Sequence, residues 1–428
     1  MKNKSRIAVF LERAPDVTFA IYAATAAFCT YFCMYAFRKP FAAGAYEGVQ
    51  FFGTEIELKT AFVISQLIGY TISKFLGLKY CSEAIARTRG KLLIGLIIVA
   101  EVALLGFAVV PGEWKAFALL LNGLPLGMVW GVVVSYLEGR RTSDLLMAGL
   151  STSFIVASGM VKDIGRWLMN SYGVGEYWMP FTVGALFLPL FCLSVWAMEQ
   201  LPKPTAEDVK SRSKRTAMSA EARWAFVKKF AFGLVTLVVF YVMLSAFRDY
   251  RDNYGIEMFA ELGYSDEPAL FSKSELPVAF GVMIAMAALN IIKDHRRGFF
   301  GALMLMGAGA VLIGVSTMLQ QSGTISGMSW MILTGLGSYL AYVPFNSVLF
   351  ERLMAYTRFT GTAVFAIYIA DSMGYLGSVT MQLYKDLLES GSSKLEFFQS
   401  YSYLTSISGV LLLGISALYF AKRRDETE

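Results

Sequence analysis

Long apolar runs alternate with short polar segments along the whole chain. A membrane-spanning helix needs about 20 mostly apolar residues to cross a hydrocarbon core of about 30 Å, where it satisfies its own backbone hydrogen bonds. The runs therefore predict twelve transmembrane helices. We expect them over residues 17–45, 57–79, 91–110, 115–138, 145–170, 177–198, 225–248, 269–292, 298–320, 328–351, 359–386 and 397–421.

One connection, residues 201–224, is longer and more polar than the others, and it divides the expected spans into six and six. Short sequence echoes relate the two halves: SAFRDY, starting at Ser245, repeats YAFRKP, starting at Tyr35, at the outer end of the first span of each half. Two similar six-helix halves are the layout of a transporter whose site lies between the bundles. We expect an N-terminal bundle over residues 1–200, a cytoplasmic linker over 201–224 and a C-terminal bundle over 225–428.

The composition fits an all-α membrane protein. Of all residues, 56% are hydrophobic and 16% are charged, against about 25% charged in soluble domains. The net charge of +6 is concentrated in the connections after even-numbered spans, which the positive-inside rule assigns to the cytoplasm. This predicts a multi-pass protein of the cell membrane with both termini cytoplasmic and no nucleic-acid partner. Residues 1–16 are expected to form a basic amphipathic segment at the membrane surface, not a cleaved signal peptide.

The sequence contains no recognisable catalytic or cofactor motif. It has no Walker loop, no GxSxG and no HExxH, the spacings that create phosphate, nucleophile and metal sites. The four cysteines, Cys29, Cys33, Cys81 and Cys192, have neither CxxC spacing nor nearby histidines, so they favour neither a metal site nor disulfides. We therefore expect no enzyme activity, no metal, no cofactor and no ATP-driven transport.

Charged residues inside the expected spans are the candidates for function, because a charge at bilayer depth costs about 2.5–3.5 kcal/mol even on the milder scales. Arg38 and Lys39 close the first span, where they either snorkel to the outer headgroups or face a cavity. Arg248 repeats the position in the second half, which an anchor does not require, so we predict that Arg38 and Arg248 face the central cavity together. Lys74 lies five residues before Lys79, the end of the second span; from depth alone it either snorkels or lines the cavity.

The fifth and eleventh spans also carry charges. Lys162 and Arg166 are four residues apart and share a helix face, while Asp163 is three residues from Arg166, close enough to pair with it. The alternatives are an internal ion pair and a charge cluster that lines the cavity. Asp371 has no charged neighbour within its own span. It should meet a basic residue from another helix or carry a proton, and a contact with Lys162 or Arg166 would act as a gate between the halves.

Taken together, two arginines and at least one lysine from both halves favour an anionic substrate. Guanidinium forks and an ammonium point charge suit phosphate or carboxylate. YFCMYAFRKPF, GYTISKFLGLKY, FYVMLSAFRDY and FTGTAVFAIYIADSMGYLGS resemble the first, second, seventh and eleventh spans of a family within the major facilitator superfamily (MFS). That family is the organophosphate:phosphate antiporters of the glycerol-3-phosphate, hexose-phosphate and glucose-6-phosphate type. The resemblance implies the twelve-helix fold of the superfamily, a cavity lysine at Lys74 and a second phosphate-binding arginine at Arg248.

The chain departs from that family at several positions. Ser158 stands where the resemblance places a histidine, Lys162, Asp163 and Arg166 follow a turn later, and Asp371 is foreign to the pattern. Such a site is compatible with another phosphate ester, a carboxylate or proton coupling. The acidic loop motif after the second span is degraded, which leaves Glu83 and Arg89 as candidate gating partners.

The function that these observations predict is secondary active transport of a small anionic solute by alternating access, in exchange for phosphate when the solute is a phosphorylated metabolite. The alternatives are proton symport of a carboxylate or sugar derivative and, more remotely, a membrane receptor that does not transport. We expect a monomer in the lipid bilayer. The predicted substrate-binding residues are Arg38, Lys74, Arg248, Ser158 and Lys162, and the predicted coupling or gating residues are Asp163, Arg166 and Asp371.

Overall fold

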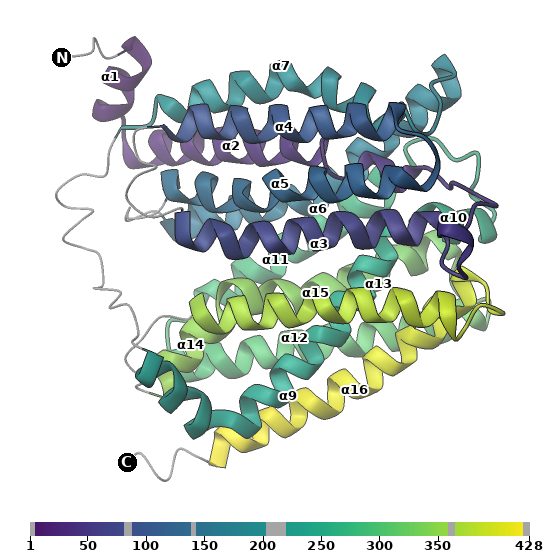
Figure 1. Cartoon of the computed structure of the whole chain (residues 1–428). Helices are drawn as coiled ribbons and strands as arrows, with labels where there is room; N and C mark the ends of the chain where they lie inside the picture. Colours follow the sequence, from purple (N-terminus) through teal and green to yellow (C-terminus); the bar gives the residue numbers. More distant parts are fainter. Residues whose placement is uncertain (1–4, 81–87, 138–142, 203–219, 358–363, 423–428) are drawn as a thin grey trace. The chain divides into compact units, whose positions relative to one another are not determined.

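The computed structural model describes residues 5–80, 88–137, 143–202, 220–357 and 364–422, and almost all of these residues are helical (Figure 1). The chain divides into two compact units, Met1–Ser213 and Lys214–Glu428, here called the N-terminal unit and the C-terminal unit. The expected bundle and linker boundaries stay a prediction, because most of the linker lies outside the described residues.

The described part of the N-terminal unit contains a short amphipathic helix and six long helices. These are α1 (Arg6–Arg13), α2 (Asp16–Tyr35), α3 (Leu58–Tyr80), α4 (Arg89–Val109), α5 (Lys115–Leu137), α6 (Ser143–Tyr172) and α7 (Met179–Glu199), with the 3₁₀ turns η1 (Pro40–Ala43), η2 (Phe51–Gly53) and η4 (Gly112–Trp114). Helix α2 packs against α6 and α7, α3 against α5, and α4 against α5 and α7.

The described part of the C-terminal unit repeats this arrangement with two additional short helices. Its helices are α9 (Ala220–Asn253), α10 (Gly255–Glu261), α11 (Leu270–Ile291), α12 (His295–Gln321), α13 (Gly327–Ser347), α14 (Leu349–Tyr356), α15 (Val364–Leu387) and α16 (Lys394–Lys422). Helix α9 packs against α15 and α16, α12 against α13 and α16, and α11 against α13.

Each of the twelve expected spans is matched by a long helix in the described residues, and two differ in form. The first was expected to continue to residue 45, but α2 ends at Tyr35. The chain continues in a turn, in which Arg38 N–H donates to the Tyr35 carbonyl three residues earlier, and η1 begins at Pro40. Proline lacks an N–H, so residue 40 cannot donate the helical hydrogen bond to the Ala36 carbonyl that a continuing helix would need. The tenth span is the bent pair α13 and α14, which meet at 51°.

Eight of the described helices are long and apolar enough to cross a membrane, or nine spans if α13 and α14 count as one. Together with α3, α6 and α15 they account for the twelve expected spans. These three helices are the ones that carry the predicted site residues Lys74, Ser158, Lys162, Asp163, Arg166 and Asp371. The chain is therefore a multi-pass all-α membrane protein in which a few helices concentrate the polar residues.

Glycine allows the helices of each unit to approach closely. A Cβ added at Gly123 of α5 would lie 2.2 Å from the Gln66 carbonyl oxygen of α3, and one added at Gly69 would lie 2.1 Å from that of Leu120. In the C-terminal unit, a Cβ at Gly309 of α12 would lie 2.4 Å from the Gly337 carbonyl oxygen. Small residues at such crossings permit the tight packing that holds membrane helices together.

Candidate functional site

Two cations of the N-terminal unit meet at one aromatic ring. The Arg38 Cζ atom lies 3.9 Å from the centroid of the Tyr70 ring, and the Lys74 Nζ atom lies 5.4 Å from the same centroid. Lys74 follows Tyr70 by one helical turn on α3, so both side chains are on one face. The buried Tyr70 ring attracts cations through the negative potential of its face. The structure thus brings together two residues that the sequence placed on different spans.

Two amide side chains, Gln66 and Asn122, fix the backbone on which Arg38 is carried. Gln66 Nε2 donates to the Arg38 carbonyl at 2.9 Å and to Asn122 Oδ1 at 2.8 Å. Asn122 Nδ2 donates to the Phe37 and Ala100 carbonyls, both at 3.0 Å. We call this pair the amide bracket. It ties the chain after α2 to α3, α4 and α5, so the position of Arg38 is set by three other helices.

Aromatic side chains continue the surface around Arg38. Its Cζ atom also lies 5.8 Å from the Tyr35 ring, and Tyr35 contacts the Tyr31 ring edge to face at 5.6 Å. The Tyr31 ring in turn meets Trp130 of α5 at 4.8 Å. Tyrosine hydroxyls and rings offer both hydrogen bonds and apolar area. The cations are therefore set beside groups able to contact an organic anion.

The predicted residues of the fifth span lie on α6. Ser158, Lys162 and Arg166 recur every four residues and are all buried, whereas Asp163 is partly exposed. Each of the four takes part in interactions with other residues, so none is an isolated charge. Helix α6 packs against α2 and η1, which places this buried polar face in the same unit as Arg38. Whether it lines a transport cavity remains a prediction.

Arg248 of the C-terminal unit repeats the arginine-over-tyrosine geometry of Arg38. Its Cζ atom lies 3.9 Å from the centroid of the Tyr342 ring on α13. Its Nη2 also donates to Asp249 Oδ1 at 2.7 Å. In the first half the residue after the arginine is Lys39, not an aspartate. Arg248 therefore has a neighbouring carboxylate that offsets its charge, while Arg38 is followed by a second cation.

Asp371 of α15 accepts a hydrogen bond from the Tyr241 hydroxyl of α9. Tyr241 also accepts one from Asn346 Nδ2 at 3.1 Å, and its ring stacks on Tyr342 with centroids 5.3 Å apart. The sequence shows no charged neighbour of Asp371 within its own span. In the structure another helix supplies a hydrogen-bond donor, the phenol of Tyr241. A continuous set of contacts runs from Arg248 through Tyr342 and Tyr241 to Asp371.

The Gly-Tyr-Leu-Gly-Ser stretch of α15 has a packing role. A Cβ added at Gly374 would lie 2.8 Å from Ser245 Oγ, and one added at Gly377 would lie 2.4 Å from a Val242 methyl group. Both glycines face α9, so they let α15 approach the helix that carries Tyr241 and Arg248. This close approach allows the hydrogen bond between Tyr241 and Asp371.

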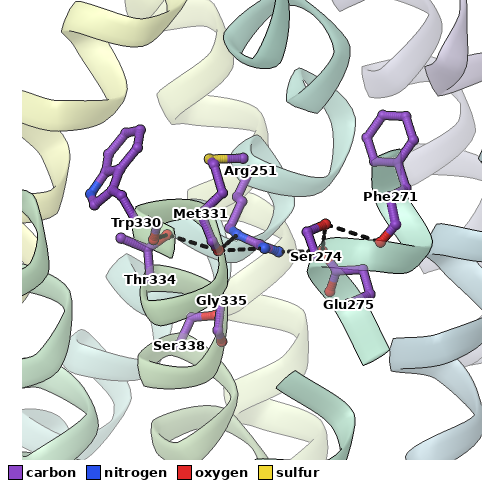
Figure 2. Close-up of polar contacts among 9 residues, drawn as sticks. All are labelled: Arg251, Phe271, Ser274, Glu275, Trp330, Met331, Thr334, Gly335 and Ser338. Carbon is purple, nitrogen blue, oxygen red and sulfur yellow. Dashed lines mark hydrogen bonds and ion pairs between the residues drawn. The ribbon is translucent and has the colours of Figure 1, made fainter. Parts of the chain in front are cut away.

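A buried ion pair fixes the C-terminal end of α9 (Figure 2). Arg251 Nη1 donates to Glu275 Oε1 of α11 at 2.8 Å, and its Nε and Nη2 donate to the Met331 carbonyl of α13 at 3.2 and 2.7 Å. A Cβ added at Gly335 would lie 2.6 Å from Arg251 Nη2, so glycine makes room for the guanidinium. Arg251 lies about one turn beyond Arg248, and the pair therefore orients the segment that carries Arg248.

A sequence profile described as a family of unknown function (DUF5690) matches residues 40–423. The chain belongs to the DUF5690 family. No curated protein matches this DUF5690 chain by sequence.

Solved structures of three transporters resemble the DUF5690 chain. A D-xylose–proton symporter shares 16% identity and a TM-score of 0.61, with 95% of this chain and 97% of that chain covered. The nucleoside transporter NupG shares 14% identity and a TM-score of 0.61, with 94% and 98% covered. A mutant of the peptide transporter POT in complex with sulfate shares 12% identity and a TM-score of 0.62, with 98% and 99% covered. This confirms the expected fold, two six-helix bundles of the MFS type, whereas the likeness to organophosphate antiporters stays a prediction.

Several polar residues around the predicted site were missed by the sequence analysis. Gln66, Asn122, Tyr241 and Tyr342 are uncharged, and their positions stand out only because each lies in an otherwise apolar run. Of the predicted gating partners after the second span, Glu83 lies outside the described residues, whereas Arg89 Nη1 donates to the Ser135 carbonyl at 2.9 Å. Within the described ranges no group of three or more histidine, cysteine or acidic side chains could hold a metal ion.

Proposed function

We propose that this DUF5690 protein is a secondary active transporter of a small anionic solute, which Arg38 and Lys74 bind in the N-terminal unit. The convergence of these two cations on the Tyr70 ring is the observation that carries the proposal. Cations inside a membrane protein are expensive to keep there, and like charges repel each other. An anion between them removes the repulsion and gains charge-assisted hydrogen bonds.

The residue types favour an oxyanion. The guanidinium of Arg38 presents a planar fork that matches phosphate or carboxylate oxygens, while the Lys74 ammonium supplies a compact charge. The aromatic groups Tyr31, Tyr35 and Trp130 suit the organic part of a phosphate ester or carboxylate. A peptide transporter of the same fold was solved in complex with sulfate, a tetrahedral oxyanion, which makes such a ligand compatible with this architecture.

Arg248 is proposed as a second anion-binding arginine, carried by the C-terminal unit. Because Asp249 already contacts Arg248 at 2.7 Å, a substrate anion would compete with Asp249 for the guanidinium. An anion that binds one conformation of the carrier more tightly than the others supplies the differential affinity that alternating access requires. Ser158, Lys162, Asp163 and Arg166 of α6 are proposed to line or gate the substrate path of the N-terminal unit.

The second candidate function is proton symport, and the hydrogen bond from Tyr241 to Asp371 is the observation that favours it. A carboxyl group within a membrane span that reaches Arg248 through tyrosines is a candidate proton carrier. The xylose transporter that shares the fold is a proton symporter. In this reading Asp371 couples proton movement to the charge state of the arginine site.

Flux measurements in proteoliposomes separate these functions. Vesicles containing the purified full-length protein are given external radiolabelled inorganic phosphate or sn-glycerol 3-phosphate, with or without phosphate inside and with or without an imposed pH gradient. Uptake that requires internal phosphate supports exchange, and uptake that follows the pH gradient supports symport. Binding without flux in either condition would refute the transport function and favour a receptor.

A further inference from the structure

Glu101 is a buried acid near the middle of α4 that the arginine site does not use. Its side chain is 8% exposed, and neither carboxyl oxygen has a hydrogen-bond partner among the described residues. Helix α4 is one of those long and apolar enough to span a membrane. A carboxyl group in this position is at bilayer depth and lacks the water that an exposed acid would have.

Helix α7 closes the space around this carboxyl group. A Cβ added at Gly184 of α7 would lie 2.1 Å from Glu101 Oε2 and 2.9 Å from its Cδ. Glycine at position 184 leaves room for the acid there, and a larger residue would push the Glu101 carboxyl group aside. The carboxyl group therefore packs directly onto the backbone surface of α7, at the point where α4 and α7 cross.

The titratable groups on the helices packed against α4 lie well away from Glu101 along the helix axes. Lys115 of α5 donates to the carbonyls of Phe107 and Ala108 at 2.8 and 3.1 Å, six and seven residues along α4 from Glu101, which is about 10 Å. Tyr136 of α5 donates to Glu199 at the far end of α7. Cys192 of α7 lies eight residues from Gly184, about 12 Å along the axis. Lys91 and Arg89 at the start of α4 lie ten and twelve residues from Glu101, about 15 and 18 Å along the axis.

This environment selects the protonated form of Glu101. Transfer of an ionised carboxylate without a partner from water to an apolar interior costs far more free energy than transfer of the neutral acid, which costs a few kcal/mol. The C-terminal unit provides a comparison at the equivalent crossing of its third and sixth long helices. There a Cβ at Gly314 of α12 would lie 2.4 Å from Ser406 Oγ of α16. There the polar side chain is a hydroxyl on the sixth helix and the glycine is on the third, so this kind of crossing does not require a carboxyl group.

The amide bracket connects this acid to the proposed anion site. Ala100, the residue before Glu101, accepts a hydrogen bond from Asn122 Nδ2 at 3.0 Å. Asn122 also holds the Phe37 carbonyl, and Gln66 holds the Arg38 carbonyl. A movement of α4 at Glu101 thus reaches the backbone of Arg38 through two side chains.

We propose that Glu101 is a proton-binding site of this protein. The carboxylic acid keeps its proton while α4 and α7 are packed together. When α7 separates from α4 and water enters, its O–H bond breaks, the proton leaves to water and a carboxylate remains. The amide bracket transmits this change to Arg38, and that last step rests on the proposed function.

Infrared difference spectroscopy of the full-length protein in lipid nanodiscs tests the protonation directly. Wild type minus Glu101→Gln at neutral pH should show the carbonyl band of a protonated carboxylic acid. The matched control, Glu113→Gln in the turn η4, which has no buried residue, should leave that band in place. Equal spectra of wild type and Glu101→Gln in this region would overturn the proposal. A second variant, Glu101→Leu, should leave the Tm unchanged or raise it, because a neutral unpartnered acid is replaced by an apolar group; a large fall would reveal a paired carboxylate and also overturn it.

Anion binding tests the link to Arg38 separately. The affinity of the wild type for inorganic phosphate should change several-fold between mildly acidic and mildly alkaline pH, in addition to the change that the titration of phosphate causes. Glu101→Gln should remove this additional pH dependence. The same additional pH dependence in Glu101→Gln and in the wild type would refute the link between Glu101 and Arg38. If the wild type binds no phosphate or phosphate ester at all, the proposed function fails, while the infrared band still decides the protonation of Glu101.

Discussion

Replacing Glu275 by leucine removes the carboxylate that Arg251 contacts at 2.8 Å and leaves the buried guanidinium with the Met331 carbonyl. Breaking a buried pair from one side typically costs 3–5 kcal/mol, because the remaining charge stays desolvated. Since Arg251 keeps its two hydrogen bonds to Met331, we expect the lower end, about 3 kcal/mol. For a unit of this size, about 3 kcal/mol corresponds to a fall of roughly 6–12 °C in Tm.

The double variant Arg251→Met with Glu275→Leu separates the ion pair from its geometry. Replacement of a buried pair by apolar residues of similar volume is often neutral or stabilising, so the double variant should recover most of the loss of the single one. Glu267→Gln provides the control on the same side of the unit. Its ion pair with Lys273 is exposed, since 36% of the Glu267 side chain and 50% of the Lys273 side chain are accessible. An exposed pair contributes about 0–1 kcal/mol to stability.

Thermal unfolding of the purified full-length protein in detergent, followed by intrinsic tryptophan fluorescence, measures all three variants. The reasoning would be refuted if Glu275→Leu kept the wild-type Tm, or if the double variant were as unstable as the single one. The first result would mean that Arg251 reaches water, and the second that the two side chains stabilise the unit by their shape alone.

Three further predictions concern the anion site and its supports. Arg38→Lys should not restore phosphate binding, because the guanidinium fork is lost; radioligand binding checks this, and wild-type affinity would contradict it. Asp371→Asn should raise anion affinity if the aspartate gates the site, whereas loss of pH-driven uptake with unchanged binding would instead assign it to proton symport. Gly123→Ala should lower the Tm by several degrees, since its Cβ would lie 2.2 Å from the Gln66 carbonyl oxygen. Gly95→Ala, whose Cβ would have nothing within 4 Å, should not lower it. Equal Tm values of the two variants would contradict the close helix crossing.

The helices could be predicted from the sequence because a bilayer imposes one requirement on every span: enough apolar length to cross it. The bend between α13 and α14 and the early end of α2 could not, since hydropathy changes little across Val348 or Ala36. Those features depend on single backbone positions, such as Pro40, whose effect on a helix is local.

The candidate site was only partly predictable because the signal used was charge. Arg38, Lys74, Arg248 and Asp371 stand out in apolar runs, but the groups that orient them, such as Gln66 and Asn122, are neutral and barely alter hydropathy. Glu101 carries the same signal as Asp371, a lone acid in an apolar run, but what surrounds it depends on Gly184 of another helix. Helix packing decides which side chains contact the same aromatic ring or donate to the same carbonyl, and a sequence pattern does not determine that packing.

Equilibrium binding of radiolabelled inorganic phosphate to the purified full-length protein in lipid nanodiscs tests most directly whether Arg38 and Lys74 form an anion site. The wild type should bind phosphate saturably, and Lys74→Gln should weaken binding at least tenfold, which is about 1.4 kcal/mol. Lys91→Gln, which removes the same charge from an exposed position of the same unit, should bind as the wild type does. Equal affinity of Lys74→Gln and wild type would contradict the account.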